Sequence, residues 1–344
     1  MIDLRSDTVT LPSEEMKRFM LSAPLGDDVF GEDPSINALE DKASSLFGKE
    51  SALFVPSGTM ANLISVLSHC NRGDEILVGN QSHIFKYEAG GSSIFGGIHS
   101  HQLPNNDDGT IAIDYINQGI HKVEDSHYAQ TRLLCLENTH NVCYGSPIKP
   151  EYFNEVKQII QPFNIKLHID GARIFNASVK LNISVEKLVF ESDSVSFCLS
   201  KGLSCPSGSL IVGKQNFINK ARRLRKALGG GMRQAGILAA AGIYALDNMV
   251  ERLAEDHLNA KILGNELKTI SGIKIDPDKI STNLIFFHLE SANLSDENFI
   301  NQLLSNKINI DYKGKHKFRI ATHCGFANNN IEKVIKTIKL ILSK

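Results

Sequence analysis

The stretch ALFVPSGTMANLISVLSHCNRGDEILVG, residues 52–79, has the pattern that decides the fold. Residues 52–56 and 75–79 are short apolar runs of strand length, and residues 59–70 between them have a helical pattern. A strand, a helix and a second strand in this order form a crossover unit whose strands run parallel. The stretch therefore predicts an α/β fold.

The same rhythm continues to about residue 215, with further apolar runs at 132–138, 165–170, 194–200 and 208–213. Helical stretches between such strands indicate a mainly parallel sheet that is covered on both faces. Ligand sites in such sheets lie beyond the carboxyl ends of the strands. The polar residues that follow each run are therefore expected to meet at one edge of the sheet.

The last hundred residues have a different pattern. Helices are predicted near 248–270, 295–306 and 330–343, and strands over 283–289 and 317–323. Because these elements lack the crossover rhythm, we expect a smaller α+β domain at this end. The predicted division is an N-terminal segment with a large domain over 1–250, and a small C-terminal domain over 251–344.

Composition excludes several classes of function. The chain has 344 residues, of which 42% are hydrophobic and 22% charged, with a formal net charge of −1. These values are ordinary for a soluble globular protein and argue against a nucleic-acid or membrane partner. Charged residues in MIDLRSDTVT (1–10) argue against a secretory signal, and the six scattered cysteines indicate reduced thiols in the cytoplasm. His140 and Cys143 lack a second ligand pair, so no metal site is predicted.

Two of the strand ends carry groups suited to a charged ligand. In SGT (57–59), Gly58 and Thr59 open a predicted helix, whose first amides suit an anion, although a plain helix cap would explain them equally. In HIDGAR (168–173), Asp170 ends a buried strand, where a carboxylate needs a cation or a donor. Arg173 is one candidate partner, and a protonated ring nitrogen of a cofactor is the other.

A lysine follows the next strand. Lys201 in SVSFCLSKGL (194–203) lies among small residues at the end of an apolar run. A buried lysine loses its charge readily, and its neutral amine forms Schiff bases, whereas a lysine at a loop can also simply reach solvent. His83 follows the strand 75–79, but a lone histidine is more often structural than functional, and the same holds for His127.

Three basic residues complete the set of candidates. Lys226 and Arg233 flank the glycines of GGGMRQ (229–234), where backbone and side chains could meet a phosphate, or the lysine and arginines could form only a solvated helix face. Arg319 lies inside the apolar run KFRIATH (317–323). It could bind a carboxylate through two hydrogen bonds or form a structural ion pair.

One ligand accounts for these features together. An anion-binding helix start, an acid facing a ring nitrogen, a Schiff-base lysine and an arginine for a carboxylate suit pyridoxal 5′-phosphate with an amino acid. The sequence therefore predicts this cofactor and a small amino-acid substrate.

The motifs MIDLRSDTVT, GDDVFGEDP, PSGTMANL, ENTHN, HIDGARIFNA, LSKGL and GGGMRQAGILAAAGIYAL together resemble those of the low-specificity L-threonine aldolases. The resemblance covers most of the chain and is strongest up to about residue 250. It implies the aspartate-aminotransferase fold, with a mainly parallel seven-stranded sheet in the large domain. It also implies cleavage of L-threonine, L-allo-threonine and similar β-hydroxy-α-amino acids to glycine and an aldehyde, in a homo-oligomer that is at least a dimer and is expected to be a tetramer.

The same resemblance assigns roles to individual residues. Lys201 matches the Schiff-base lysine, Asp170 the acid at the pyridine nitrogen, and Arg173 the arginine near the ring hydroxyl and the substrate. The remaining matches are divided by role: Gly58 and Thr59 with the phosphate, His83 with the ring face, His127 with a second active-site imidazole, Ser6 and Arg319 with the substrate carboxylate, and Lys226 and Arg233 with the phosphate of a neighbouring subunit.

Some questions stay open at this stage. Phe30 stands where a tyrosine is familiar, so a hydroxyl contact there is lost. Either His83 or His127, or a water molecule, could be the base for the β-hydroxyl group. The preference for threo or allo substrates and the presence of a structural cation are also undecided. A β-eliminating lyase, an amino-acid racemase and a silent cofactor-binding protein are the alternative functions.

Overall fold

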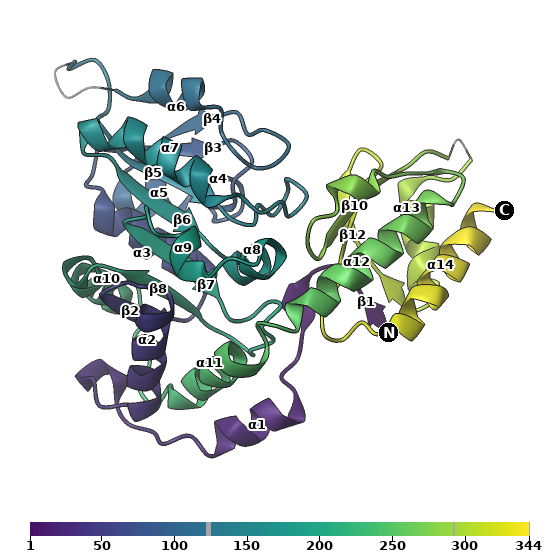
Figure 1. Cartoon of the computed structure of the whole chain (residues 1–344), viewed down its shortest axis with the longest axis horizontal. Helices are drawn as coiled ribbons and strands as arrows, with labels where there is room; N and C mark the ends of the chain where they lie inside the picture. The colour runs from purple at the N-terminus through teal and green to yellow at the C-terminus, as the bar shows by residue number, and fades with distance from the viewer. Residues whose placement is uncertain (122–124, 292, 344) are drawn as a thin grey trace.

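The computed structural model describes residues 1–121, 125–291 and 293–343. It has two units, which lie side by side in Figure 1. The larger unit contains most of the chain up to α11 (Gly236–Asn248), and α12 (Leu253–Lys268) leads into the smaller one. Among the described residues, no helix has the length and apolar character needed to cross a membrane.

The large unit is built on a seven-stranded sheet in the order β2-β8-β7-β6-β5-β3-β4. The strands are β2 (Ser51–Val55), β3 (Glu75–Gly79), β4 (His99–Leu103), β5 (Thr131–Glu137), β6 (Lys166–Asp170), β7 (Ser194–Cys198) and β8 (Ser209–Gly213). Only β8 runs antiparallel to its neighbours, β2 and β7. The predicted mainly parallel seven-stranded α/β fold is confirmed.

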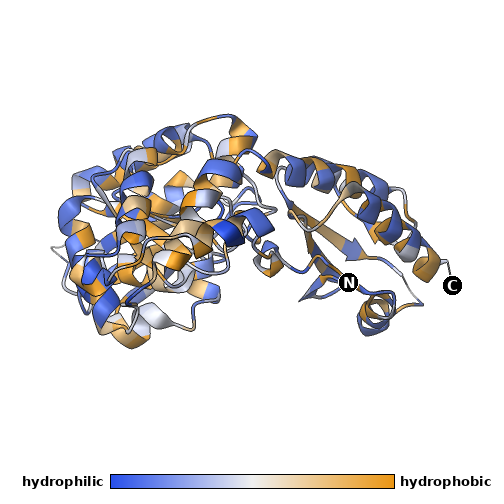
Figure 2. Cartoon of the chain, turned by 90° about the horizontal axis from the view of Figure 1, so that it is seen from below, coloured by the Kyte–Doolittle hydropathy of each residue, from blue (hydrophilic) through white to orange (hydrophobic). Residues whose placement is uncertain are grey.

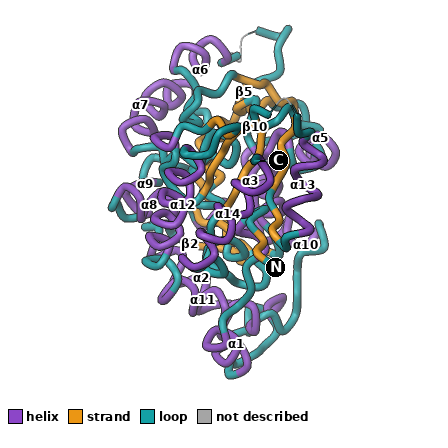
Figure 3. Tube along the Cα trace, turned by 90° about the vertical axis from the view of Figure 1, so that its right-hand side faces the viewer, coloured by secondary structure: helices purple, strands orange, loops and turns teal. Residues whose placement is uncertain are grey.

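Successive side chains of a strand point to opposite faces of the sheet, and apolar side chains on both faces explain why helices cover both. In β3, Leu77 joins one apolar core, whereas Ile76 and Val78 join another on the opposite face. Helices α3 (Gly58–His69), α4 (His83–Lys86), α5 (Gly91–Gly96) and α10 (Gln215–Ala227) lie on the face of Ile76. The other face is covered by α2 (Pro34–Leu46), α6 (Ile113–Gly119), α7 (Pro150–Ile160), α8 (Ile174–Leu181), α9 (Val185–Leu188) and α11. Helix α1 (Glu14–Leu21) packs on α11. Figure 3 shows the strands in the middle of these layers.

The small unit has its own sheet and core. Its four strands run antiparallel in the order β12 (Asp311–Gly314), β13 (Lys317–Ala321), β10 (Leu284–Leu289) and β9 (Ile273–Lys274). Helices α12, α13 (Asp296–Ser305) and α14 (Asn328–Leu342) pack on this sheet. In Figure 2 blue and orange segments alternate along the helices of both units, as expected for helices with one buried face.

The N-terminus belongs to the small unit by packing. Strand β1 (Ile2–Asp3) pairs with β11 (Ile308–Asn309), and Leu4 is buried in the core of the small unit. The sequence placed these residues with the large domain because two paired residues leave no readable pattern. We keep the boundary at 250/251 as a proposal and count residues 1–4 with the small unit.

Candidate active site

A pocket of about 220 Å³ lies where the two units meet, at the carboxyl ends of the parallel strands. Its lining residues come from the N-terminal segment, the strand ends and the small sheet: Ser6, Thr8, His83, Tyr87, Glu137, Asn141, Ala172, Arg173, Lys201, Lys313 and Arg319. Five residues predicted from the sequence are therefore brought together here, namely Ser6, His83, Arg173, Lys201 and Arg319.

Lys201 reaches this pocket from the loop between β7 and β8. Its backbone carbonyl accepts a hydrogen bond of 2.8 Å from the hydroxyl of Thr10. The N-terminal segment thus holds the loop in place, and the side chain of Lys201 is half-buried. Its amine is available to a ligand and is not simply directed to solvent.

Asp170 is the last residue of β6 and is 2% exposed. Its Oδ2 accepts a hydrogen bond of 2.9 Å from Asn62, and its Oδ1 accepts one of 3.1 Å from the amide of Ala172. Arg173, considered above as its partner, pairs with a different carboxylate. Among the described residues, both groups that donate to Asp170 are neutral, which leaves its charge available to a cationic ring nitrogen.

His83 begins α4 beside Asp170. Its Nδ1 lies 2.8 Å from Oε1 of Glu88, an acid that is 6% exposed. Burial alone would lower the pKa of His83, but the hydrogen bond to Glu88 and the charge of Asp170 raise it above its usual value. For the acid Glu88, burial has the opposite effect and raises the pKa. The contact between the two side chains fixes the orientation of the imidazole ring.

Arg173 is fixed by Asp7 from the N-terminal segment. Its Nε donates to Oδ2 of Asp7 at 2.7 Å and its Nη2 to Oδ1 at 2.6 Å, and both residues are buried. Burial opposes the charge of Asp7, but Arg173 holds the pKa of that carboxyl well below its usual range. A bidentate pair of this kind sets both the position and the orientation of the guanidinium group.

Arg319 lies next to Arg173, and one amide connects them. Oδ1 of Asn141 accepts from Nη1 of Arg319 at 2.7 Å and from Nη1 of Arg173 at 3.1 Å. Arg319 also pairs with Asp311 at 2.8 Å. Its buried Nε has no hydrogen-bond partner within the described part of the chain. Burial and the charge of Arg173 lower the pKa of Arg319. Two neighbouring guanidinium groups strongly favour an anionic ligand.

Gly58 and Thr59 begin α3, beyond the residues that line the pocket. A Cβ at Gly58 would come within 2.7 Å of Sγ of Cys198, so the helix start packs directly against the end of β7. The hydroxyl of Ser57 accepts from the amide of Met60, which is the predicted cap. Both the cap and the exposed helix start are therefore present.

Three predicted residues lie away from this pocket in the same chain. The side chain of His127 is 87% exposed and its Nδ1 lies 2.9 Å from Asp125, next to residues 122–124 outside the described part. Lys226 is exposed at the end of α10. Arg233 is also exposed and pairs with Asp27 at 2.9 Å, with its guanidinium group 5.7 Å from the centre of the exposed Phe30 ring.

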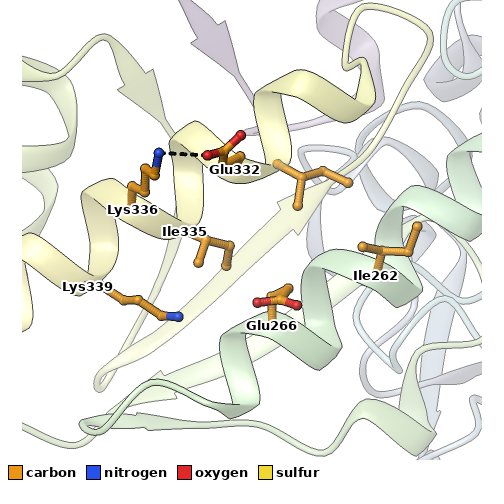
Figure 4. A pocket seen from close by; sticks show the side chains of 7 residues that line it. Ile262, Glu266, Glu332, Ile335, Lys336 and Lys339 are labelled. Carbon is orange, nitrogen blue, oxygen red and sulfur yellow. Dashed lines mark ion pairs between the residues drawn. The ribbon is translucent and has the colours of Figure 1, made fainter.

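A second hollow, of about 460 Å³, lies on the small unit between α12 and α14. Figure 4 shows its isoleucine side chains with Glu266, Glu332 and lysines around them. Lys336 pairs with Glu332 on the same helix. This groove is larger than the pocket at the strand ends but holds no convergent polar groups among its described residues, so we place the active site at the strand ends.

Comparison with known proteins agrees with this geometry. The family described as beta-eliminating lyase matches residues 3–290. A low-specificity L-threonine aldolase of Arabidopsis thaliana is 46% identical over 94% of this chain and 91% of its own length. The chain belongs to the low-specificity L-threonine aldolases of this family. The low specificity L-threonine aldolase of Escherichia coli K12 is 48% identical over 85% of this chain and 86% of its own length.

Solved structures place this threonine aldolase family member in the expected fold. A threonine aldolase of Leishmania major aligns with a TM-score of 0.84 at 18% identity, over 99% of this chain and 100% of that one. A serine palmitoyltransferase of Sphingomonas wittichii aligns with a TM-score of 0.77 at 16% identity, over 99% of this chain and 86% of that one.

The residues of this aldolase family member fit pyridoxal phosphate. Lys201 supplies an amine, Asp170 a buried carboxylate without a cationic partner among the described residues, and the start of α3 exposed amides. The neighbouring guanidinium groups of Arg173 and Arg319 suit the carboxylate of an amino acid beside the cofactor.

Sequence reasoning missed several residues of the site. Asp7, Glu88 and Asn141 hold the predicted side chains, yet each reads alone as an ordinary surface polar residue. Asp7 and Asn141 could have been found from their positions in the motifs LRSDT and ENTHN. Glu88 lies outside any motif, and only the fold brings it to His83.

Proposed function

We propose that this protein cleaves L-threonine, L-allo-threonine and related β-hydroxy-α-amino acids to glycine and an aldehyde, with pyridoxal phosphate as cofactor. The observation that carries this proposal is the pair Arg173 and Arg319, which meet at Asn141 in the pocket that also holds Lys201. This arrangement binds a carboxylate beside a reactive amine, as an α-amino acid requires.

In this proposal, Lys201 holds the cofactor through its Nζ and Asp170 keeps the proton on its ring nitrogen. Gly58 and Thr59 contact its phosphate through the start of α3. When bound, the cofactor supplies an electron sink for the substrate's α-carbon. Burial of Asp170 strengthens its effect, because a charge in a region of low dielectric is poorly screened.

Arg319 and Ser6 bind the substrate carboxylate, and Arg173 supports them. Arg319 lines the pocket, and its contacts to Asn141, Asp311 and the carbonyl of Arg5 hold its guanidinium group in place. Fixing the carboxylate at one side of the pocket sets the direction in which the β-substituent points. The bond to be broken is thereby oriented before the reaction begins.

His83 accepts the proton of the β-hydroxyl group. It lines the pocket, whereas His127 is exposed in this chain. Glu88 holds Nδ1 of His83, so the ring has a defined tautomer and orientation. Proton removal by a positioned imidazole contributes about 10²–10⁴-fold to a rate.

We expect His83→Ala to lower kcat/KM for L-threonine about 10²-fold, and His127→Ala to change it less than about threefold. Because the pKa of His83 is raised, the imidazole loses its proton only above its ordinary value of about 6.5. Wild-type kcat/KM should therefore rise with pH through this region. Comparing pH–rate profiles of both variants checks the assignment. If the fall in kcat/KM at low pH disappeared in His127→Ala but remained in His83→Ala, His127 would be the base and His83 would not.

Glu88 is expected to set the pH at which kcat/KM rises, that is, the position of the acid limb of the pH–rate profile. In Glu88→Gln, the charged hydrogen-bond partner that raises the pKa of His83 is removed, so the acid limb should move to lower pH. The maximum rate above the limb should change little, because the base itself is retained. An unmoved limb in the pH–rate profile of a folded Glu88→Gln variant would show that Glu88 has only a structural role.

Product analysis separates the alternative functions. An aldolase releases an aldehyde and glycine from L-threonine without ammonia, a β-eliminating lyase releases ammonia, and a racemase gives D-threonine. A silent binding protein turns over none of these substrates. Measuring all products from L-threonine, L-allo-threonine and their D forms also decides the threo or allo preference.

We further propose a cytoplasmic homo-oligomer, a dimer at least and a tetramer as a dimer of dimers. Lys226 and Arg233 support this proposal, since both are exposed and lie outside the pocket of their own chain. In an oligomer Lys226 would reach a neighbouring subunit's phosphate directly, and Arg233 would reach it by leaving its exposed pair with Asp27. Light scattering of the purified protein measures the assembly.

A further inference from the structure

A cluster of histidines surrounds a buried carboxylate at the opposite end of β3 from the active site. Glu75 is the first residue of β3 and is 1% exposed. His99 and His101 stand two residues apart on the neighbouring edge strand β4, and His121 precedes β5. The active site lies beyond Gly79, about 13 Å along the same strand.

The contacts within this cluster are close but are not hydrogen bonds. Nδ1 of His121 lies 3.0 Å from Oε1 of Glu75, and Nδ1 of His101 lies 3.7 Å from the same oxygen. Both nitrogen atoms are buried, and neither has a hydrogen-bond partner within the described ranges of the chain. The two imidazole rings stack with their centres 5.3 Å apart. Both nitrogens therefore converge on one carboxylate oxygen without bonding to it.

The negative charge of Glu75 is only partly compensated by its neighbours. The hydroxyl of Thr131 donates to its Oε1 at 2.8 Å. Its other oxygen faces Nε2 of His99, at 3.6 Å. A carboxylate buried this deeply requires a cation close by.

We propose that Glu75, His101 and His121 bind a divalent transition-metal ion of the zinc class. Ligand atoms of these three residues lie within 4.8 Å of one another. Bonds of about 2.0–2.2 Å in a tetrahedral site place ligand atoms about 3.3 Å apart. The separations of 3.0 and 3.7 Å between Oε1 of Glu75 and the two imidazole nitrogens bracket that value. Imidazole nitrogens with one carboxylate are a ligand set that suits zinc.

The role of this metal is structural. The ligands join β3, the edge strand β4 and the segment before β5, all at the amino ends of the strands. An ion here would fix an edge strand whose own sequence, HSHQL (99–103), is polar and mostly exposed. It would take no part in substrate binding, because the pocket lies at the other ends of these strands. The sequence-based expectation of no metal considered only His140 and Cys143.

Zinc titration of the cofactor-loaded protein tests this site. After dialysis against a chelator, calorimetry should show one zinc ion bound per chain with a Kd in the micromolar range or below. The variant His101→Gln/His121→Gln should bind at least about tenfold more weakly, and so should His121→Gln alone. The control is His316→Gln, whose imidazole forms an exposed pair with Asp296 at 2.8 Å. It should bind zinc as the wild type does.

Thermal unfolding and turnover give independent readouts. Zinc at about one hundred times the Kd of the wild type should raise the Tm of the wild type by about 3–5 °C, and that of the double variant by at most about half as much. Turnover of L-threonine should be alike in the wild type and the double variant. Absence of zinc binding by the wild type would overturn the proposal. Equal zinc affinity of the wild type and the double variant would also overturn it, since zinc would then bind elsewhere, such as at His83, Glu88 and Asp170.

Discussion

Replacing Lys201 by alanine is expected to lower kcat/KM for L-threonine by at least about 10⁴-fold, the largest effect of any single change in the pocket. Lys201 is a pocket residue on the loop after β7, and its position depends on the backbone contact of that loop with Thr10. Removing the amine therefore removes the covalent attachment without disturbing the fold. Purified wild-type protein should be yellow, and the alanine variant should lose the cofactor on dialysis.

The matched control is Lys201→Arg. It keeps a positive charge near Asp7, which that charge helps to keep ionised. A guanidinium group cannot become a neutral nucleophile near neutral pH, so this variant should be as inactive as Lys201→Ala while keeping the Tm of the wild type. Turnover above about 1% of wild type in either variant would show that Lys201 is not the attachment residue.

The fold was readable from the sequence because strong local signals coincide with tertiary burial. The apolar run 75–79 is identical to β3, and the runs near 52–56 and 132–138 differ from β2 and β5 by one residue. β4 was missed because its sequence, HSHQL, has no apolar alternation and lies at the edge of the sheet. β1 was missed because two residues carry no period, and their pairing with β11 spans nearly the whole chain.

The site was readable only in part. Strand ends predicted where Lys201, His83 and Arg173 would meet, because parallel strands place their carboxyl ends at one edge. The partners of these residues could not be predicted. Arg173 lies three residues from Asp170, yet it pairs with Asp7, 166 residues away, since only the fold brings the N-terminal segment over the sheet edge. Proximity in sequence indicated the wrong carboxylate.

This buried pair leads to the second large effect. We expect Asp7→Asn to lower the free energy of unfolding by about 3–5 kcal/mol, because Arg173 would be left buried without its counter-charge. Asn283, which also donates to Asp7 at 3.2 Å, would lose an ionised acceptor. The midpoint of urea unfolding measures this change. Glu14→Gln, which removes an exposed pair with Lys17, is the control and should leave the midpoint nearly unchanged.

The pH dependence of stability separates the ion pair from mere packing. Because the pKa of Asp7 in the folded protein lies below its unfolded value of about 3.9, its contribution is fully present above about pH 4. It is lost progressively as the pH falls further towards the folded pKa. The difference between the wild type and Asp7→Asn should therefore be constant near neutral pH and shrink in acid. A difference that does not change with pH would indicate lost packing in place of a lost charge.

Activity then shows what the pair does for the site. Asp7→Asn removes the group that orients Arg173, so KM for L-threonine should rise together with the loss of stability. A double variant, Asp7→Asn/Arg173→Met, carries no unpaired charge and should recover part of the stability. It should not recover substrate binding, because Asn141 would then hold Arg319 alone. Recovery of stability without recovery of KM would establish that the pair positions the carboxylate-binding arginines, whereas recovery of both would show that its role is only structural.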